Sequence, residues 1–469
     1  MGRFETGSTG VGRTLRADSL DALRGYAIVT MVLASAILSY ALPGWMSHVQ
    51  TPPPDHAYHP EIPGISWVDL VFPFFLFALG AALPFSLGPK LSRGESGLKL
   101  VALSALRALK LAFFAIVLQH VYSPVRASAD NPASWLIPIS AFVALFLTFC
   151  RFPGNIPKTL RAGIHVVGYL SSILIVLLAC RFYPRDFSLS RSNIIILVMA
   201  NMAFFASLAY IATYRMKPAL RLLLVPLVMF ILLAEGSWQQ WLLNATPAPW
   251  LYRFAYLKYL CIVIPGTVAG DYLRDSLNCN WRHYASHDKS AIMLIMCLGL
   301  VILNLWGLYT RNLELNLILT LMMLAVCIGL SAENEFWRRL VLLGSMLLAF
   351  GLFAESFQGG IKKDPATLSY FLTTSGLACF ALLAFDILCG VFNCNRSMSV
   401  LVMPGKNPML AYVTTSLLVN PLLQLTSLWD LLGMMDYHPV AAFMRGVIVT
   451  SITVAVTILF TKLKCLWRT

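Results

Sequence analysis

The stretch GISWVDLVFPFFLFALGAAL, residues 64–83, decides the fold of this chain, because from Val71 onward it carries no charged side chain. Such an apolar run is typical of a helix that crosses a lipid bilayer. Asp69 lies in the first turn of that helix, where an acidic side chain is costly and therefore a functional candidate. The polar loop before it contains three of the eight histidines: His48, His56 and His59. Histidine moves protons near neutral pH, so we expect chemistry at this end of the helix.

The composition predicts an integral membrane protein. Hydrophobic residues make up 58% of the chain and charged residues 12%, and the mean hydropathy is +0.73, whereas about a quarter of the residues of a soluble domain are charged. Because backbone groups in lipid must be paired internally, we predict an all-α fold, a polytopic transmembrane helix bundle. The net charge of +14 comes from Lys and Arg spread through short loops, which favours a role in membrane topology over nucleic-acid binding.

The apolar runs predict how the chain is divided. There are about 14 of them, each near the roughly 20 residues that a span needs, and we expect about 12–14 spans. Residues 1–20 form a basic polar tail, and residues 21–469 form a single membrane domain. The ten cysteines lack metal-ligand spacing and lie mostly inside apolar runs, so we expect neither disulfides nor zinc.

The distribution of basic residues predicts the orientation of the chain. With the N-terminus inside, about 22 Lys and Arg fall in inside segments and about 8 in outside loops, which agrees with the positive-inside rule. Both termini are then cytoplasmic, and the loop that carries His59 is extracytoplasmic.

Two groups of side chains are candidates for a site on the outside. In the first, Asp69 would orient the imidazole of one of the three loop histidines, His48, His56 or His59, in a proton-handling site. The alternatives are a surface loop with chance histidines, or a metal held by the His56–His59 pair. The second group would bind a substrate and consists of Lys363, Asp364 and Glu235. For Lys363 and Asp364 the alternative is a solvated loop end.

A third group lies on the inside. Lys406 and Asn407 stand where a predicted helix starts, and a helix N-terminus with a Lys beside it is a ready phosphate site. Together with Arg24, on the first turn of the first span, they would dock a phosphate-bearing ligand from the cytosol. The segment GKNP alone is far short of a nucleotide-binding loop.

Five segments of the chain resemble a known family: SLDALRGYAIVTMVL (19–33), WVDLVFPFFLFALG (67–80), IPGTVAGDYL (264–273), IKKDPATLSYFLTTS (361–375) and PGKNPMLAY (404–412). They are similar to the membrane domain of the heparan-α-glucosaminide N-acetyltransferase family, which includes bacterial relatives. In that family the active-site His stands ten residues before the Asp of the D-L-V-F-P motif. His59 holds that place here. The resemblance covers the first 90 residues well and the last 120 moderately.

The resemblance implies transmembrane acetylation, in the inner membrane of a bacterium. Acetyl-CoA would bind from the cytosol at Arg24, Lys406 and Asn407, and its acetyl group would pass to the amine of a glucosamine-type sugar outside. His59 would act as the base, or would carry the acetyl group briefly as acetyl-imidazole, while Asp69 fixes the ring. The expected partners are the sugar, the lipid bilayer and a second copy of the chain, with no nucleic acid.

Two departures from the family leave the acceptor open. Lys362 stands where the family has Asn, and Ala366 where it has an aromatic residue. One alternative is an acyltransferase for a hydroxyl of a surface glycan. A multi-span sugar transporter without chemistry is the other, since many spans, kinking prolines and polar residues within spans suit it equally well.

Overall fold

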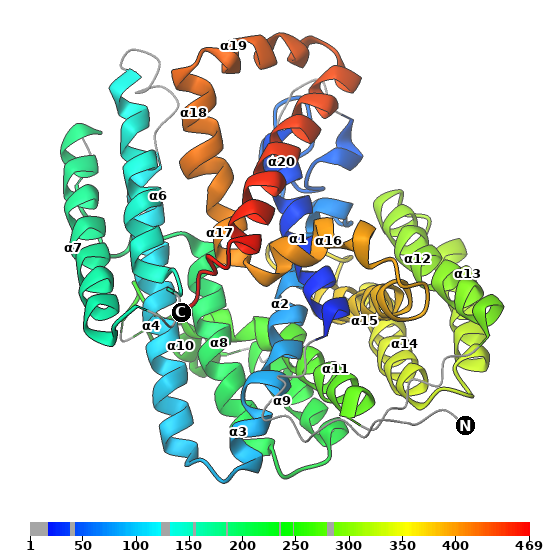
Figure 1. Ribbon diagram of the computed structural model, residues 1–469. Coiled ribbons are helices and arrows are strands. Elements are labelled where there is room, and N and C mark those ends of the chain that lie inside the picture. The colour runs from blue at the N-terminus through cyan, green and yellow to red at the C-terminus, as the bar shows by residue number, and fades with distance from the viewer. Residues whose placement is uncertain are drawn as a thin grey trace, which may run out of the picture.

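The computed structural model describes residues 17–37, 43–122, 132–152, 156–183, 186–233, 236–246, 248–278 and 286–469. All regular structure in these ranges is helical, which confirms the predicted all-α membrane bundle. The α-helices are α1 Asp18–Ala36, α2 Trp67–Ser86, α3 Gly88–Ser92, α4 Gly97–Val121, α6 Leu136–Phe149, α7 Lys158–Phe182, α8 Ile194–Thr213, α9 Leu224–Leu233, α10 Ser237–Asn244, α11 Leu260–Asn278, α12 His287–Tyr309, α13 Leu313–Leu330, α14 Glu335–Glu355, α15 Leu368–Gly390, α16 Asn395–Lys406, α17 Pro408–Thr414, α18 Asn420–Leu425, α19 Leu428–Gly433 and α20 Pro439–Lys462 (Figure 1).

Nine helices within the described ranges are long and apolar enough to cross a membrane. A tenth span is formed if the segments Pro408–Leu425 and Leu428–Tyr437, which meet at an angle of 103°, count as one. The remaining expected runs are helical too. Leu136–Phe149 and Pro218–Ile231 are shorter, and α11 carries charged side chains in its second half. The apolar runs of the sequence therefore correspond to helices throughout the described ranges, but some of these helices are too short or too charged to count as membrane spans.

Burial separates central from peripheral helices. The apolar stretch of α15 is 89% buried and that of α2 is 78% buried, whereas those of α7 and α13 are only 22% buried. Figure 1 shows α7 and α13 at opposite edges of the molecule, with α1, α2 and α11 between them. The apolar side chains of α7 point outward, as Leu170 does with 62% exposure. The central helices α1, α2 and α15 carry three of the sequence motifs, whereas PGKNPMLAY lies on α16 and α17.

A close crossing of α1 and α16 fixes the relation between the first motif and the last. A side chain on Gly25 would collide with the backbone carbonyl of Leu401, and one on Gly405 with that of Asp21. Only glycine allows the two backbones to approach so closely. The crossing brings Arg24 of α1 to the end of α16 that carries Lys406. The guanidinium of Arg24 donates there to the carbonyl oxygen of Gly405, the residue before Lys406, at 3.2 Å.

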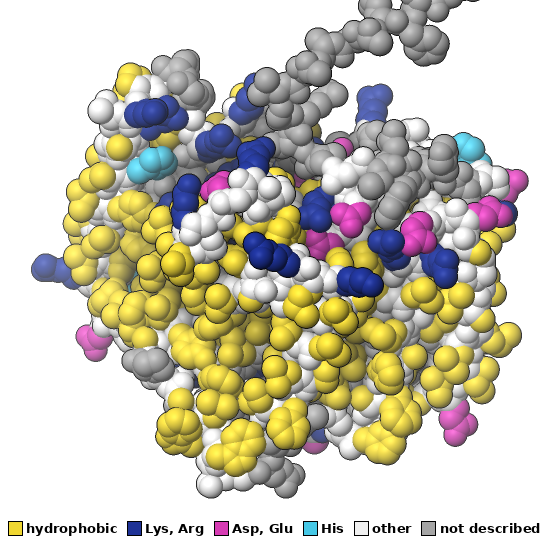
Figure 2. All heavy atoms as spheres, turned by 90° about the horizontal axis from the view of Figure 1, so that it is seen from below, with side chains coloured by type: hydrophobic (Ala, Val, Ile, Leu, Met, Phe, Trp, Pro, Cys, Tyr) yellow, Lys and Arg dark blue, Asp and Glu magenta, His cyan; other side chains and the backbone are white. Residues whose placement is uncertain are grey.

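The surface divides into apolar and basic regions. Figure 2 shows hydrophobic side chains over the lower part of one face and a band of Lys and Arg side chains across its upper part. An apolar surface of this extent fits a lipid bilayer environment, with the basic band at one boundary of the membrane.

Candidate functional site

The first turn of α2 positions the carboxylate of Asp69. Ser66 precedes the helix, and its backbone N–H and its hydroxyl both donate to Oδ2 of Asp69, at 3.1 and 3.2 Å. The backbone N–H of Val49 donates to the same oxygen at 3.3 Å, and Tyr370 of α15 donates its hydroxyl to the Asp69 carbonyl oxygen at 2.9 Å. The carboxylate is thus buried and folded back onto the loop, with Oδ1 directed to further partners.

His48 and Lys363 are those partners. Nδ1 of His48 lies 2.6 Å from Oδ1 of Asp69, and Nζ of Lys363 lies 3.4 Å from the same oxygen. Asp69 is 2% exposed, whereas the side chain of His48 is 41% exposed. Nζ of Lys363 also lies 3.1 Å from Nδ1 and 3.4 Å from Nε2 of His48. When Nδ1–H donates to the carboxylate, the lone pair of Nε2 can accept a proton from the Lys363 ammonium or from a substrate, which is the arrangement of a general base oriented by an acid. We call His48, Asp69 and Lys363 the outer cluster, after the side of the membrane on which the sequence predicts this loop to lie.

Gln50 fastens the two segments that supply the outer cluster. Its side-chain oxygen accepts from the backbone N–H of Asp364 at 2.9 Å, and its side-chain nitrogen donates to the Asp364 carbonyl at 2.5 Å. Tyr58 donates its hydroxyl to the same carbonyl at 2.6 Å. The loop that holds His48 is therefore bound to the segment that holds Lys363, although more than 300 residues separate them.

The predicted pairing of Asp69 with His59 is wrong, because His48 occupies the carboxylate. Nδ1 of His59 lies 3.0 Å from Oε1 of Glu61 instead, and its backbone N–H donates to the Gln50 carbonyl at 2.8 Å. A backbone hydrogen bond and the ring of His59 lower the pKa of Glu61. His59 thus belongs to the same loop as the outer cluster but has a separate, exposed carboxylate as its partner.

The three predicted substrate-binding residues do not lie together in one site. Lys363 joins the outer cluster, and Asp364 contributes its backbone to the clamp made by Gln50 while its side chain is exposed. Glu235 lies outside the described residues. Within the described ranges, no group of three His, Cys, Asp or Glu side chains is placed to hold a metal ion.

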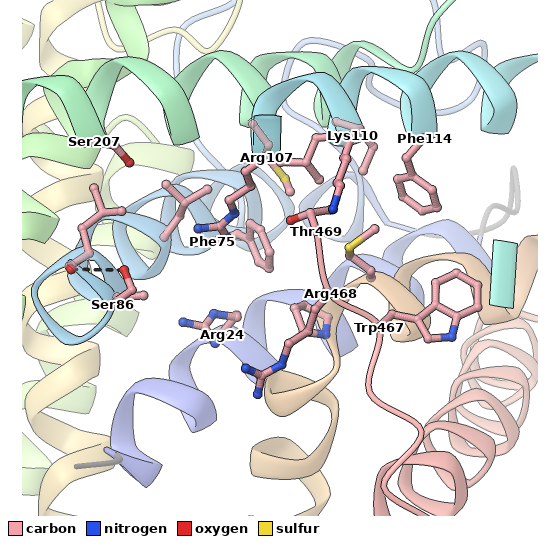
Figure 3. Close-up of a pocket in the computed structure, with 18 of the residues that line it drawn as sticks. Arg24, Phe75, Ser86, Arg107, Lys110, Phe114, Ser207, Trp467, Arg468 and Thr469 are labelled. Carbon is pink, nitrogen blue, oxygen red and sulfur yellow. Dashed lines mark hydrogen bonds between the residues drawn. The ribbon is translucent and has the colours of Figure 1, made fainter. Parts of the chain in front are cut away.

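A cavity of about 630 Å³ opens among α1, α2, α4, α8 and α16. Six cationic side chains line it, against one acidic side chain, Asp21, among the described residues of its wall. The cations are Arg24, Lys90, Arg107, Lys110, Lys406 and Arg468. Figure 3 shows the side chains of Arg24, Arg107 and Arg468 directed at one shared space. We call this cavity the basic pocket; its charge favours a ligand with several negative charges.

The predicted cations Arg24 and Lys406 do line the basic pocket. Arg24 pairs with Asp21 at 3.2 Å, and Lys406 pairs with Asp18 at 3.0 Å. Arg107 and Lys110 were not predicted to line this site, although two cations three residues apart in an apolar run are a signal that the sequence contains.

Asn407 was predicted to contact the cofactor, and the structure corrects this. Its side chain is fully buried, donating to the Cys465 carbonyl at 2.9 Å and accepting from the Trp467 N–H at 3.0 Å. Asn407 therefore holds the segment 465–469, which carries Arg468 into the basic pocket.

Helix α2 connects the two sites. Asp69 is in its first turn, whereas Phe75, Leu79 and Ser86 line the basic pocket. At 1.5 Å per residue, Phe75 lies about 9 Å and Ser86 about 25 Å along the axis from Asp69. The basic pocket thus reaches from one end of α2 toward the outer cluster at the other.

Comparison with known proteins gives a family but no activity. A family model described as a domain of unknown function (DUF5009) matches residues 16–273, which is more than half of the chain. The chain therefore belongs to that family. No curated protein matches it.

Proposed function

We propose that this member of the DUF5009 family is a transmembrane acyltransferase, which takes an acetyl group from cytosolic acetyl-CoA and transfers it to an amine of a glucosamine-type sugar on the other side. The observation that carries the proposal is the pair of sites on α2: a polyanion pocket at one end and a carboxylate-oriented imidazole at the other. A donor on one side and an acceptor on the other require such an arrangement.

The basic pocket suits the donor in charge and size. Acetyl-CoA carries three phosphate groups, and cationic side chains form their strongest hydrogen bonds with such ionised acceptors. The volume of about 630 Å³ falls within the roughly 300–1,000 Å³ of typical ligand pockets. Toward the outer cluster the wall becomes apolar, with Phe75, Leu79 and Ile28, and these side chains would pack against the long uncharged arm that carries the thioester.

The outer cluster suits the chemistry of acyl transfer. The amine nitrogen attacks the thioester carbonyl, the nitrogen–carbon bond forms, the carbon–sulfur bond breaks, and CoA leaves as its thiol. Nε2 of His48 takes the proton that the amine loses and returns it to the sulfur. Asp69 stabilises the imidazolium that forms between these steps, and Lys363 balances the carboxylate when the ring is neutral.

A two-step route uses the same nitrogen. Nε2 of His48 would attack the thioester, release CoA and hold the acetyl group as acetyl-imidazole until the amine takes it. Both routes need the Nδ1 proton to face Asp69, so both depend on the same pair. The family resemblance assigns this role to His59, and the proposal moves it to His48 because His48 has the buried carboxylate as its partner.

The test is transfer by the purified protein. Protein in detergent is mixed with acetyl-CoA labelled in its acetyl group and with glucosamine, and labelled N-acetylglucosamine is measured for wild type, His48→Ala and His438→Ala. His438 is the control, because it is an exposed histidine whose Nδ1 accepts from the backbone N–H of Val440 at the start of α20 and which forms no contact with His48, Asp69 or Lys363 among the hydrogen bonds of the described residues. Product from wild type and His438→Ala but not from His48→Ala supports the proposal. Absence of both product and acetyl-CoA binding in wild type contradicts it, and uptake of unmodified sugar would then favour a transporter.

A further inference from the structure

Two cations of the basic pocket lie deep in a membrane span. Helix α4 begins at Gly97 and ends at Val121. Arg107 and Lys110 follow Gly97 by ten and thirteen residues, which places them about 15 and 20 Å along a helix of about 37 Å. Both are therefore near the middle of α4 rather than in its first turn, where Lys99 lies. A cation at that depth costs several kcal/mol in a lipid environment unless something compensates it.

No acidic side chain of the described residues compensates these two cations. Neither Arg107 nor Lys110 forms an ion pair within the described ranges, in contrast to Arg24 and Lys406, which pair with Asp21 and Asp18. Arg107 is exposed to the pocket rather than packed away, and Lys110 is partly exposed. Unpaired cations that face a cavity within a span mark a path or a site for an anion.

The C-terminal segment adds a third cation from the facing wall. The backbone N–H of Arg468 donates to the Phe149 carbonyl at 2.9 Å, and the neighbouring Trp467 is 2% exposed among aromatic side chains of α6. Asn407 of the facing helix end binds the backbone of Cys465 and Trp467, so hydrogen bonds to two elements hold the segment that carries Arg468. Figure 3 shows Arg107 entering the basic pocket from α4, and Arg468 on the facing C-terminal segment with its side chain extending away from α4, on the side where Arg24 lies.

We infer that Arg107, Lys110 and Arg468 form a subsite for a diphosphate group at about half the depth of the bilayer. The inference rests on the proposed function in naming CoA as the ligand that carries the diphosphate. Deep binding of the phosphates would move the thioester toward the outer end of α2, so that the acetyl group crosses the remaining distance on the arm of CoA. Arg24, Lys90 and Lys406 are then left for the nucleotide end of the ligand.

The test is binding of CoA to the full-length protein in lipid nanodiscs, by isothermal titration. Arg107→Gln and Lys110→Gln should each weaken binding about tenfold or more, because each removes a charge-assisted hydrogen bond in a water-poor site. Lys99→Gln is the matched control: Lys99 is on the first turn of α4, 65% exposed and paired with Glu95. The affinity of Lys99→Gln for CoA should stay within about twofold of that of wild type. Values within twofold for both Arg107→Gln and Lys110→Gln overturn the inference.

Two further measurements test whether the variants remain folded and whether the diphosphate belongs to a nucleotide or to a lipid. Arg107→Lys keeps the charge and should retain most of the affinity that Arg107→Gln loses, which separates loss of a contact from loss of structure. Farnesyl diphosphate tests a lipid-borne diphosphate as the source. Binding of this lipid through Arg107, with no binding of CoA, would overturn the nucleotide ligand.

The transfer assay distinguishes the two proposals. Binding of CoA that depends on Arg107, without acetyl transfer by wild type, upholds the subsite and refutes the acyltransferase. Acetyl transfer by wild type that is unchanged in Arg107→Gln upholds the acyltransferase and refutes the subsite.

Discussion

Nδ1 of His48 lies 2.6 Å from Oδ1 of Asp69, although 21 residues separate the two in the chain. The pair stands at one end of α2, while side chains of the same helix between Phe75 and Ser86 line a cavity rich in cations. This relationship gives one helix a part in both a proton-accepting site and an anion-binding site.

Replacing the two loop histidines separately distinguishes the imidazole that acts as the base. We expect His48→Ala to lower kcat for acetyl transfer by about two orders of magnitude or more, which is the usual worth of a positioned base. His59→Ala should change kcat only severalfold, because the partner of His59 is the exposed Glu61. Steady-state kinetics of both variants provide the check. The reverse ranking would assign the reaction to His59 and leave His48 as a structural residue.

Asp69→Asn tests whether the carboxylate acts through the ring. The amide cannot stabilise the imidazolium, so kcat should fall by about tenfold to a hundredfold. The KM for acetyl-CoA should stay within about twofold, because Asp69 is not part of the basic pocket. A thermal unfolding curve is the control, since Asp69 also accepts the hydrogen bonds of Ser66 at the start of α2. An unchanged kcat in a folded Asp69→Asn protein would remove the oriented imidazole from the mechanism.

Much of the fold could be predicted from the sequence, because apolar runs and the need to pair backbone groups leave few choices in a bilayer. Arg24 and Lys406 were predicted to lie together, and both line the basic pocket, because the close crossing of α1 and α16 joins their two motifs. The partner of Asp69 was not, because it depends on how the loop closes. That closure is fixed by the hydrogen bonds between Gln50 and Asp364. Because these residues are far apart in the chain, no local sequence pattern predicts their contact.

The basic pocket shows a second limit of the sequence. Arg107 and Lys110 stand in an apolar run as a readable signal, but their common cavity with Arg468 arises only when the C-terminal segment folds back onto α6 and α16. Asn407 was assigned to the ligand because of its place beside Lys406. In the folded chain its side chain turns away from the cavity toward residues 465–467, and its role becomes one of support.

Asn407 and Arg468 should act as a coupled pair. Asn407→Ala removes two buried hydrogen bonds and should cost about 1–3 kcal/mol of stability, and it should weaken CoA binding because Arg468 loses its position. In a double-mutant cycle with Arg468→Gln, the loss of binding should be clearly less than additive. Titration of CoA into the two single variants and the double variant measures this. Full additivity would show that Asn407 does not act through Arg468.

The crossing of α1 and α16 should tolerate no added methyl group. Gly25→Ala places a Cβ against the Leu401 carbonyl, and we expect a loss of about 1–3 kcal/mol or more, since two backbones must separate. Gly329→Ala in α13 is the matched control, because no atom lies within 4 Å of its added Cβ. Thermal unfolding in the same detergent compares the two. Equal stability of both variants would contradict the close approach of α1 and α16.

The most direct test of the central claim is acetyl transfer across a sealed membrane. The protein is reconstituted into liposomes that enclose glucosamine, and acetyl-CoA with a labelled acetyl group is added only outside. The account predicts labelled N-acetylglucosamine inside intact liposomes, with the CoA thiol released outside and no product for His48→Ala. Product that forms only when donor and acceptor share one compartment, or no product at all, would contradict transfer through the helix bundle.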